Sequence, residues 1–169
     1  MKNATPVVAP GRGAERPLTW VAIAAAGDAA VYAVAADRRM AVPQFRLRDE
    51  TARSSERDLG TDRPGRTFDR FGHGRHAVAN GDRDDDERRQ RFARRIGQRL
   101  DEGRRRGDYD RLVIVATPAL LGALRRLLPA PTRATIVREV SRNLADTDLG
   151  TAGPDTLREL VPGALETPE

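Results

Sequence analysis

The chain has 169 residues, a formal net charge of +5 and a pI near 10.7, and it contains no cysteine. This length provides for one domain with one hydrophobic core, and the absence of cysteine excludes disulfide frameworks and thiolate metal sites. Strongly basic proteins often bind nucleic acid or anionic lipid. Here, however, all but one of the 30 basic residues are arginines, so general residue usage explains much of the charge, which alone identifies no partner.

The N-terminal part of the chain shows no pattern of a targeting or membrane segment. Residues 1–17 contain three prolines and two glycines and lack the apolar core of a signal peptide, so we predict a disordered segment. The run from Trp20 to Ala36 is the most apolar stretch, but Gly27-Asp28 interrupts it, and a spanning helix needs about 20 strongly apolar residues. We therefore expect a cytoplasmic protein with no membrane span, a single α/β domain over residues 18–162 and a loose tail over 163–169.

Three strands are predicted at the start of this domain. The segments Val21–Ala25 and Val31–Ala35 carry Val, Ile and Tyr and flank a Gly-Asp turn, which is typical of an antiparallel hairpin. A third apolar segment, Met40–Leu47, contains Pro43, which cannot donate a hydrogen bond to a neighbouring strand. This segment is predicted to be a third strand, at an edge of the sheet or beside a bulge.

The segment 58–77 is predicted to be the functional part of the chain, inside a long connection that covers residues 48–82. Its sequence, DLGTDRPGRTFDRFGHGRHA, has neither helical nor strand periodicity, so we predict a loop. Loops of this length in compact domains are mostly functional or disordered. Its glycines permit close approach of the backbone to a ligand, and its arginines match phosphate and carboxylate geometry, which favours contact with an anion or a nucleic acid.

The strongest helical pattern runs from Asp84 to Arg106, with four acidic residues first and arginines later, an order that the helix dipole favours. Three acid-before-base pairs are predicted at i,i+4 spacing: Asp84–Arg88, Asp85–Arg89 and Glu87–Arg91. An apolar stripe predicted to pack on the sheet consists of Phe92, Ala93, Ile96 and Leu100. The arginines on the opposite face form either a solvated surface or a surface that contacts RNA.

The C-terminal half alternates strands and helices. The continuous apolar run Leu112–Ala116 is typical of a strand covered on both faces, and Thr117-Pro118 supplies the N-cap and first-turn proline of a helix that Pro129 closes. A strand over Ala134–Val140 follows, which implies a parallel crossover, and a short last helix is predicted after Asp155.

The resulting order, β-β-β-α-β-α-β-α with helices packed on a mixed sheet, is the α/β order of ribonuclease H-like folds. A two-metal nuclease of this fold would need carboxylates on the first strand and near later elements, to hold Mg²⁺ ions about 3.5–4 Å apart. Asp28 lies in the first turn and Asp110 at the wrong end of its strand, so that chemistry is not expected.

Four features between about Trp20 and Val161 carry a family resemblance. They are the opening strand that begins with the aromatic Trp20, the sequence of the segment 58–77, RFARRI at 91–96 and DRLVIVATPALLGALRRLL at 110–128. The chain resembles the bacterial host attachment protein family, whose name implies a requirement in attachment to host cells.

A more distant resemblance concerns the order of elements and the Gly-rich basic loop that precedes RFAR. Both are similar to the middle domain of archaeal and eukaryotic class 1 peptide chain release factors, in which a Gly-Gly-Gln tip promotes peptidyl-tRNA hydrolysis on the ribosome. The corresponding stretch here is Gly72-His73-Gly74-Arg75-His76, without Gly-Gly-Gln. The resemblance therefore implies RNA or ribosome contact more than hydrolysis, and we do not expect codon reading, for which these residues offer no counterpart of the factor's other domains.

The candidate ligand- or RNA-binding residues all lie in this loop: Asp62, Arg63, Gly65, Arg66, Gly72, His73, Gly74, Arg75 and His76. His76 is also the candidate catalytic residue, as a general base that Asp62 or Asp69 assists. The H-x-x-H spacing of the two histidines is compatible with a metal, but without a helical scaffold we assign neither a metal nor a cofactor.

Structural alternatives stand beside each of these roles. The glycines could serve turn geometry alone rather than ligand approach. The arginines could pair with aspartates of the same loop rather than with phosphates. Phe68 and Phe71 either stack on bases or pin the loop to the domain.

Three functions remain open from the sequence. The first is a non-enzymatic protein that presents the segment 58–77 to RNA or the ribosome. The second is a hydrolase, release-factor-like or metal-dependent, centred on His76. The third is a protein–protein adaptor in attachment to host cells.

Overall fold

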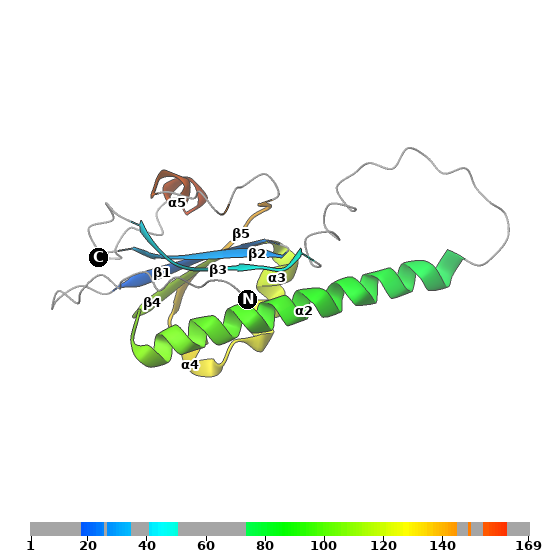
Figure 1. The fold of residues 1–169 in the computed structure, drawn as a ribbon, viewed down its shortest axis with the longest axis horizontal. Helices are drawn as coiled ribbons and strands as arrows, with labels where there is room; N and C mark the ends of the chain where they lie inside the picture. Colours follow the sequence, from blue (N-terminus) through cyan, green and yellow to red (C-terminus); the bar gives the residue numbers. More distant parts are fainter. Residues whose placement is uncertain are drawn as a thin grey trace.

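The computed structural model describes residues 18–25, 27–34, 41–50, 74–144, 149 and 154–161 (Figure 1). Within the helix Gly74–Arg106 it describes the side chains from Arg83 onward. The strands are β1 (Thr19–Ala25), β2 (Asp28–Val34), β3 (Ala41–Arg48), β4 (Arg111–Ala116) and β5 (Ile136–Ser141). The helices are α2 (Gly74–Arg106), α3 (Pro118–Leu127), α4 (Ala130–Arg133) and α5 (Pro154–Leu160).

The strands form one mixed sheet in the order β3-β2-β1-β4-β5. β2 is antiparallel to β1 and β3, whereas β1, β4 and β5 run parallel to one another. The predicted hairpin is confirmed, and it turns at Gly27, whose φ of 74° suits a residue without a Cβ. Pro43 lies on the edge strand β3 beside a register shift, as its missing N–H group requires.

Helices cover both faces of the sheet, with α2 and α3 on one side and α5 on the other (Figure 1). Alternating residues of β4 enter the two cores: Leu112 and Ile114 face α2 and α3, and Val113 and Val115 face α5. This explains the continuous apolar run of β4, because each face needs its own buried side chains. Every member of the predicted α2 stripe is buried, which confirms that this stripe packs on the sheet.

The structure corrects one helix boundary and one strand boundary, and it adds one helix. α2 begins at Gly74, ten residues before the predicted start, so its first turn carries no acidic residue and the proposed pairing of acids with the dipole there is wrong. The predicted basic C-terminal turn is confirmed. The chain after Pro129 makes the extra helix α4, because Pro129 initiates a helical turn as well as ending the previous one, and β5 therefore begins at Ile136.

The structure also tests two smaller predictions, one about the N-cap of α3 and one about α5. Thr117 occupies the N-cap position of α3, but its hydroxyl makes no capping hydrogen bond. The predicted last helix is confirmed as α5, which buries Leu157 and Leu160 against the sheet. In the described part of the chain, no helix combines the length and the apolar character that crossing a bilayer requires.

Candidate functional site

The predicted site residues fall on either side of the start of α2. Gly74, Arg75 and His76 form the first turn of this helix, so the predicted loop is wrong from residue 74 onward. Once a helix exists, each added residue gains a hydrogen bond, and this continues α2 through a stretch that Gly74 and Gly81 disfavour. The remaining predicted residues lie outside the described ones, and their roles stay predictions: Asp62, Arg63, Gly65, Arg66, Gly72 and His73.

The N-terminal half of α2 extends beyond the sheet as an arm (Figure 1). Among the described side chains of this helix, the first buried one is Phe92, and none from Arg83 to Arg91 is buried. The rise of about 1.5 Å per residue places Gly74 about 27 Å from Phe92 along the helix axis. Residues 74–76 are therefore displayed well away from the core.

The chain leaves the sheet at a fixed point on the side of α2. The backbone N–H of Asp49 donates to the carbonyl of Gly27 at 2.7 Å, and the carboxylate of Asp49 pairs with Arg95 at 3.3 Å. Arg95 is 21 residues after Gly74, which corresponds to about 32 Å along the helix. Asp49 and Gly74 therefore lie at well-separated points along α2.

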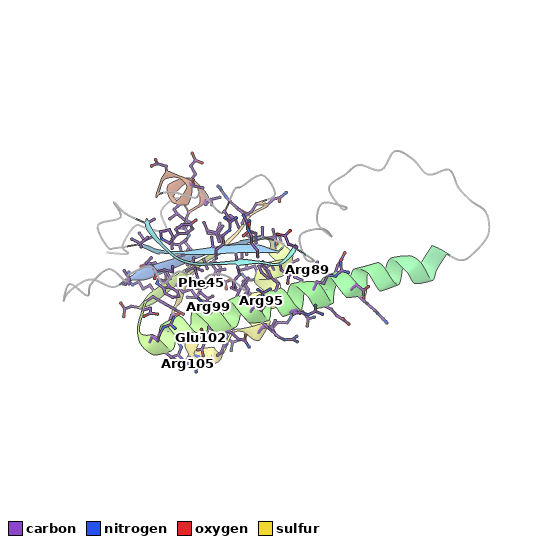
Figure 2. All side chains as sticks on the ribbon, in the orientation of Figure 1. Phe45, Arg89, Arg95, Arg99, Glu102 and Arg105 are labelled. Atoms are coloured by element: carbon purple, nitrogen blue, oxygen red, sulfur yellow. The ribbon has the colours of Figure 1, made fainter. Side chains whose placement is uncertain are left out.

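The arginines on the flank of α2 that faces β3 have partners. Figure 2 shows Arg89, Arg95 and Arg99 along this helix, with Phe45 of β3 next to Arg99. The guanidinium carbon of Arg99 lies 5.0 Å from the ring centroid of Phe45, and Glu102 lies 3.7 Å from Arg99 on its other side. Arg89 pairs with Asp86 at 3.1 Å rather than with the predicted Asp85. The charges of these three arginines are therefore largely paired within the domain.

The C-terminal end of α2 holds a second group of committed charges around Asp101. The Thr132 hydroxyl donates to this carboxylate at 2.7 Å, and Arg104 and Arg105 pair with it at 3.0 and 2.9 Å. The hydrogen bond from Thr132 is the main cause that lowers the pKa of Asp101; the two arginines lower it further, while burial opposes them. Because Thr132 belongs to α4, this cluster joins α2 to α4 and has a structural role.

The outermost face of α2 differs from both flanks. Arg91, Arg94 and Gln98 form what we call the outer ridge, and all three are exposed. Neither arginine makes an ion pair with another described residue, and the predicted Glu87–Arg91 pair does not form within this part of the chain. The sequence predicted the basic face of this helix, but it did not indicate that Arg91 and Arg94 lack an ion-pair partner among the described residues. Which arginines stay unpaired depends on where Asp49 and Asp101 lie in three dimensions.

Asp28 and Asp110, the two carboxylates considered for a nuclease site, lie at opposite ends of β1. Asp28 lies at the carboxyl end of β1, where Arg46 and Arg48 pair with it, whereas Asp110 accepts a hydrogen bond from the backbone of Leu18 before β1 begins. The length of the seven-residue strand, about 20 Å, separates them. No group of three potential metal ligands occurs among the described residues.

Comparison with known proteins identifies one family. The family model described as protein required for attachment to host cells matches residues 20–151, which is most of the chain. A search of curated proteins found no match.

Proposed function

We propose that this chain, which belongs to the family of proteins required for attachment to host cells, is a non-enzymatic RNA- or ribosome-associated binding protein. In this proposal the segment 58–77 is the binding element, and its last residues are carried on the first turn of α2. The single observation that supports the proposal best is the α2 arm, which begins at Gly74 and reaches Phe92 before any described side chain of the helix is buried. An element displayed in this way is accessible to a large partner.

The finer fold assignment belongs to the same proposal. We infer a ribonuclease H-like fold, which the sheet order β3-β2-β1-β4-β5 and the single antiparallel strand β2, between β3 and β1, support, although α4 adds a helix to the expected order. We also retain the release-factor likeness as a hypothesis: the basic stretch ending at His76 leads directly into the helix that contains RFAR. A cytoplasmic location is part of this hypothesis.

The proposal is tested by RNA binding of the purified protein. Affinity for ribosomes or tRNA should fall as salt rises, because binding to phosphates releases counterions, and Arg75→Ala should lower affinity at every salt concentration. Arg111→Ala is a suitable control, since it removes the same charge from a half-buried position in β4. Equal affinity of wild type and Arg75→Ala would show that this segment does not bind the RNA.

A second function, a protein–protein adaptor in attachment, rests on the family description. It predicts that the protein is found at the cell envelope, whereas the RNA-binding proposal predicts that it co-fractionates with ribosomes. A tagged pull-down with and without RNase separates the two, because only RNA-mediated partners are lost after RNase treatment. The hydrolase centred on His76 stays a prediction, which turnover of peptidyl-tRNA by the purified protein would test.

A further inference from the structure

We propose that the outer ridge of α2 is a second binding site, which contacts the phosphate backbone of double-helical RNA without reading its sequence. The inference rests on the proposed function for the choice of RNA over other polyanions. It concerns a different surface from the segment 58–77, and this surface consists of described residues only.

The geometry of the ridge is that of a short, straight row of donors. Arg91, Arg94 and Gln98 are spaced three and four residues apart, so they project from the same side of the helix. The row is about 10 Å long along the axis, from the rise of 1.5 Å per residue. The buried stripe on the opposite side of α2 fixes the rotation of the helix, and the ridge therefore faces solvent permanently.

The charge of the ridge is available for a partner. The arginines on the flanks are neutralised by Asp49, Asp86, Asp101 and Glu102, whereas Arg91 and Arg94 pair with no described acid. The identity of these residues as arginines carries little information in a chain with a single lysine. What distinguishes Arg91 and Arg94 is that they lie one turn apart on the same side of one helix and that neither makes an ion pair with a described acid.

The chemistry around the ridge favours a phosphate backbone over other anionic partners. Binding to single strands depends on exposed aromatic rings that stack on bases, but the aromatic side chains in the described ranges are buried, or, for Phe45, half-buried beneath Arg99. A helix that lies on a membrane inserts an apolar face, but the apolar face of α2 is packed on the sheet. Val137, the one strongly exposed large apolar side chain among the described residues, lies far from this helix in sequence, on β5.

Duplex RNA fits the remaining possibilities best. Contacts to phosphates position a protein but carry no sequence information, and double-stranded RNA is recognised mostly by shape and backbone. A duplex also presents two phosphate strands to a straight row of donors, so a ridge of this length meets more charge than on a single strand. The expected partner is therefore a helical region of structured RNA.

The test compares two double variants of the full chain by fluorescence anisotropy, with a labelled RNA duplex of about two helical turns over a series of salt concentrations. Arg91→Ala/Arg94→Ala removes the charge of the ridge. Arg126→Ala/Arg138→Ala removes the same charge from exposed positions of α3 and β5 that also lack an ion pair with a described residue. Circular dichroism before each titration confirms that both variants are folded.

We expect the plot of log affinity against log salt to become shallower by about two for the ridge variant, one for each lost phosphate contact, and to stay unchanged for the control. Scrambling the duplex sequence should leave wild-type affinity unchanged. An equal effect of both variants would overturn the proposal, because net charge would then explain the binding. So would tighter binding to single-stranded RNA or to phosphatidylserine vesicles than to the duplex.

The outcomes separate this inference from the proposed function. If Arg75→Ala has no effect while the ridge variant loses affinity, the assignment of the segment 58–77 fails and the ridge stands. If Arg75→Ala weakens binding and the ridge variant does not, the ridge is overturned and the proposed function stands. A wild-type protein that binds neither duplex nor ribosome at low salt overturns both.

Discussion

Gly103 in α2 provides the sharpest test of how this helix packs. Replacing a glycine by alanine inside a helix normally stabilises it by about 1 kcal/mol, since alanine loses less conformational entropy on folding. At Gly103, however, an added Cβ would lie 2.3 Å from Cη2 and 2.5 Å from Cζ3 of Trp20. Ordinary contacts between carbon atoms are about 3.5–4.0 Å, so one of the two elements must move by more than 1 Å.

Trp20 has little freedom to make that movement. Its side chain is 2% exposed, and its ring is stacked on Tyr109 at 4.6 Å and meets Phe45 edge-on at 5.9 Å. Overpacking of a core costs about 1–3 kcal/mol, and a clash this close calls for the upper end of that range. After subtraction of the gain in helix propensity, we expect Gly103→Ala to lower the free energy of unfolding by about 2 kcal/mol.

Thermal and urea denaturation followed by circular dichroism measure this effect, and two glycines provide matched controls. A Cβ at Gly97 would meet Leu128 at 3.5 Å, and one at Gly122 would come no closer than 4.0 Å to Arg126. Both controls should be neutral or stabilised by up to about 1 kcal/mol. A Gly103→Ala protein as stable as these controls would contradict this packing, because Trp20 could not then lie against this turn of α2.

Two further predictions concern titration. Tyr109→Phe removes the hydrogen bond from the phenol to the carbonyl of Leu100 and should cost about 0.5–1.5 kcal/mol at neutral pH. Burial raises the pKa of Tyr109. The stabilisation that the neutral phenol gives the folded state is therefore present below about pH 10 and is lost as the pH rises through the pKa of Tyr109 in the folded protein. Urea titrations at increasing pH should show this alkaline loss of stability in the wild type and not in Tyr109→Phe. The lowered pKa of Asp101 has the opposite consequence, because it stabilises the folded state at neutral pH and this stabilisation is lost in acid. Asp101→Asn should therefore be less stable than wild type at pH 7, and the difference should shrink below about pH 4. Acid titration of the stability of both proteins would reveal or disprove this trend.

The sequence predicted those features that local pattern determines. The stripe that includes Phe92 and Leu100 identified the buried face of α2, and Pro43 identified an edge strand, because periodicity and a missing donor act locally. The start of α2 was not predictable in this way. Residues 74–83 have no apolar periodicity, and the helix through them continues from a segment whose stability comes from packing farther along the chain.

The candidate site required information that no sequence window contains. The i,i+4 rule predicted partners for the arginines of α2 within the helix, but Arg95 takes its partner Asp49 from the end of β3, and Thr132 of α4 holds Asp101 in place. These contacts depend on the rotation of α2, which the core side chains fix. In this chain, therefore, hydrophobic packing rather than charge decides which arginines remain available at the surface.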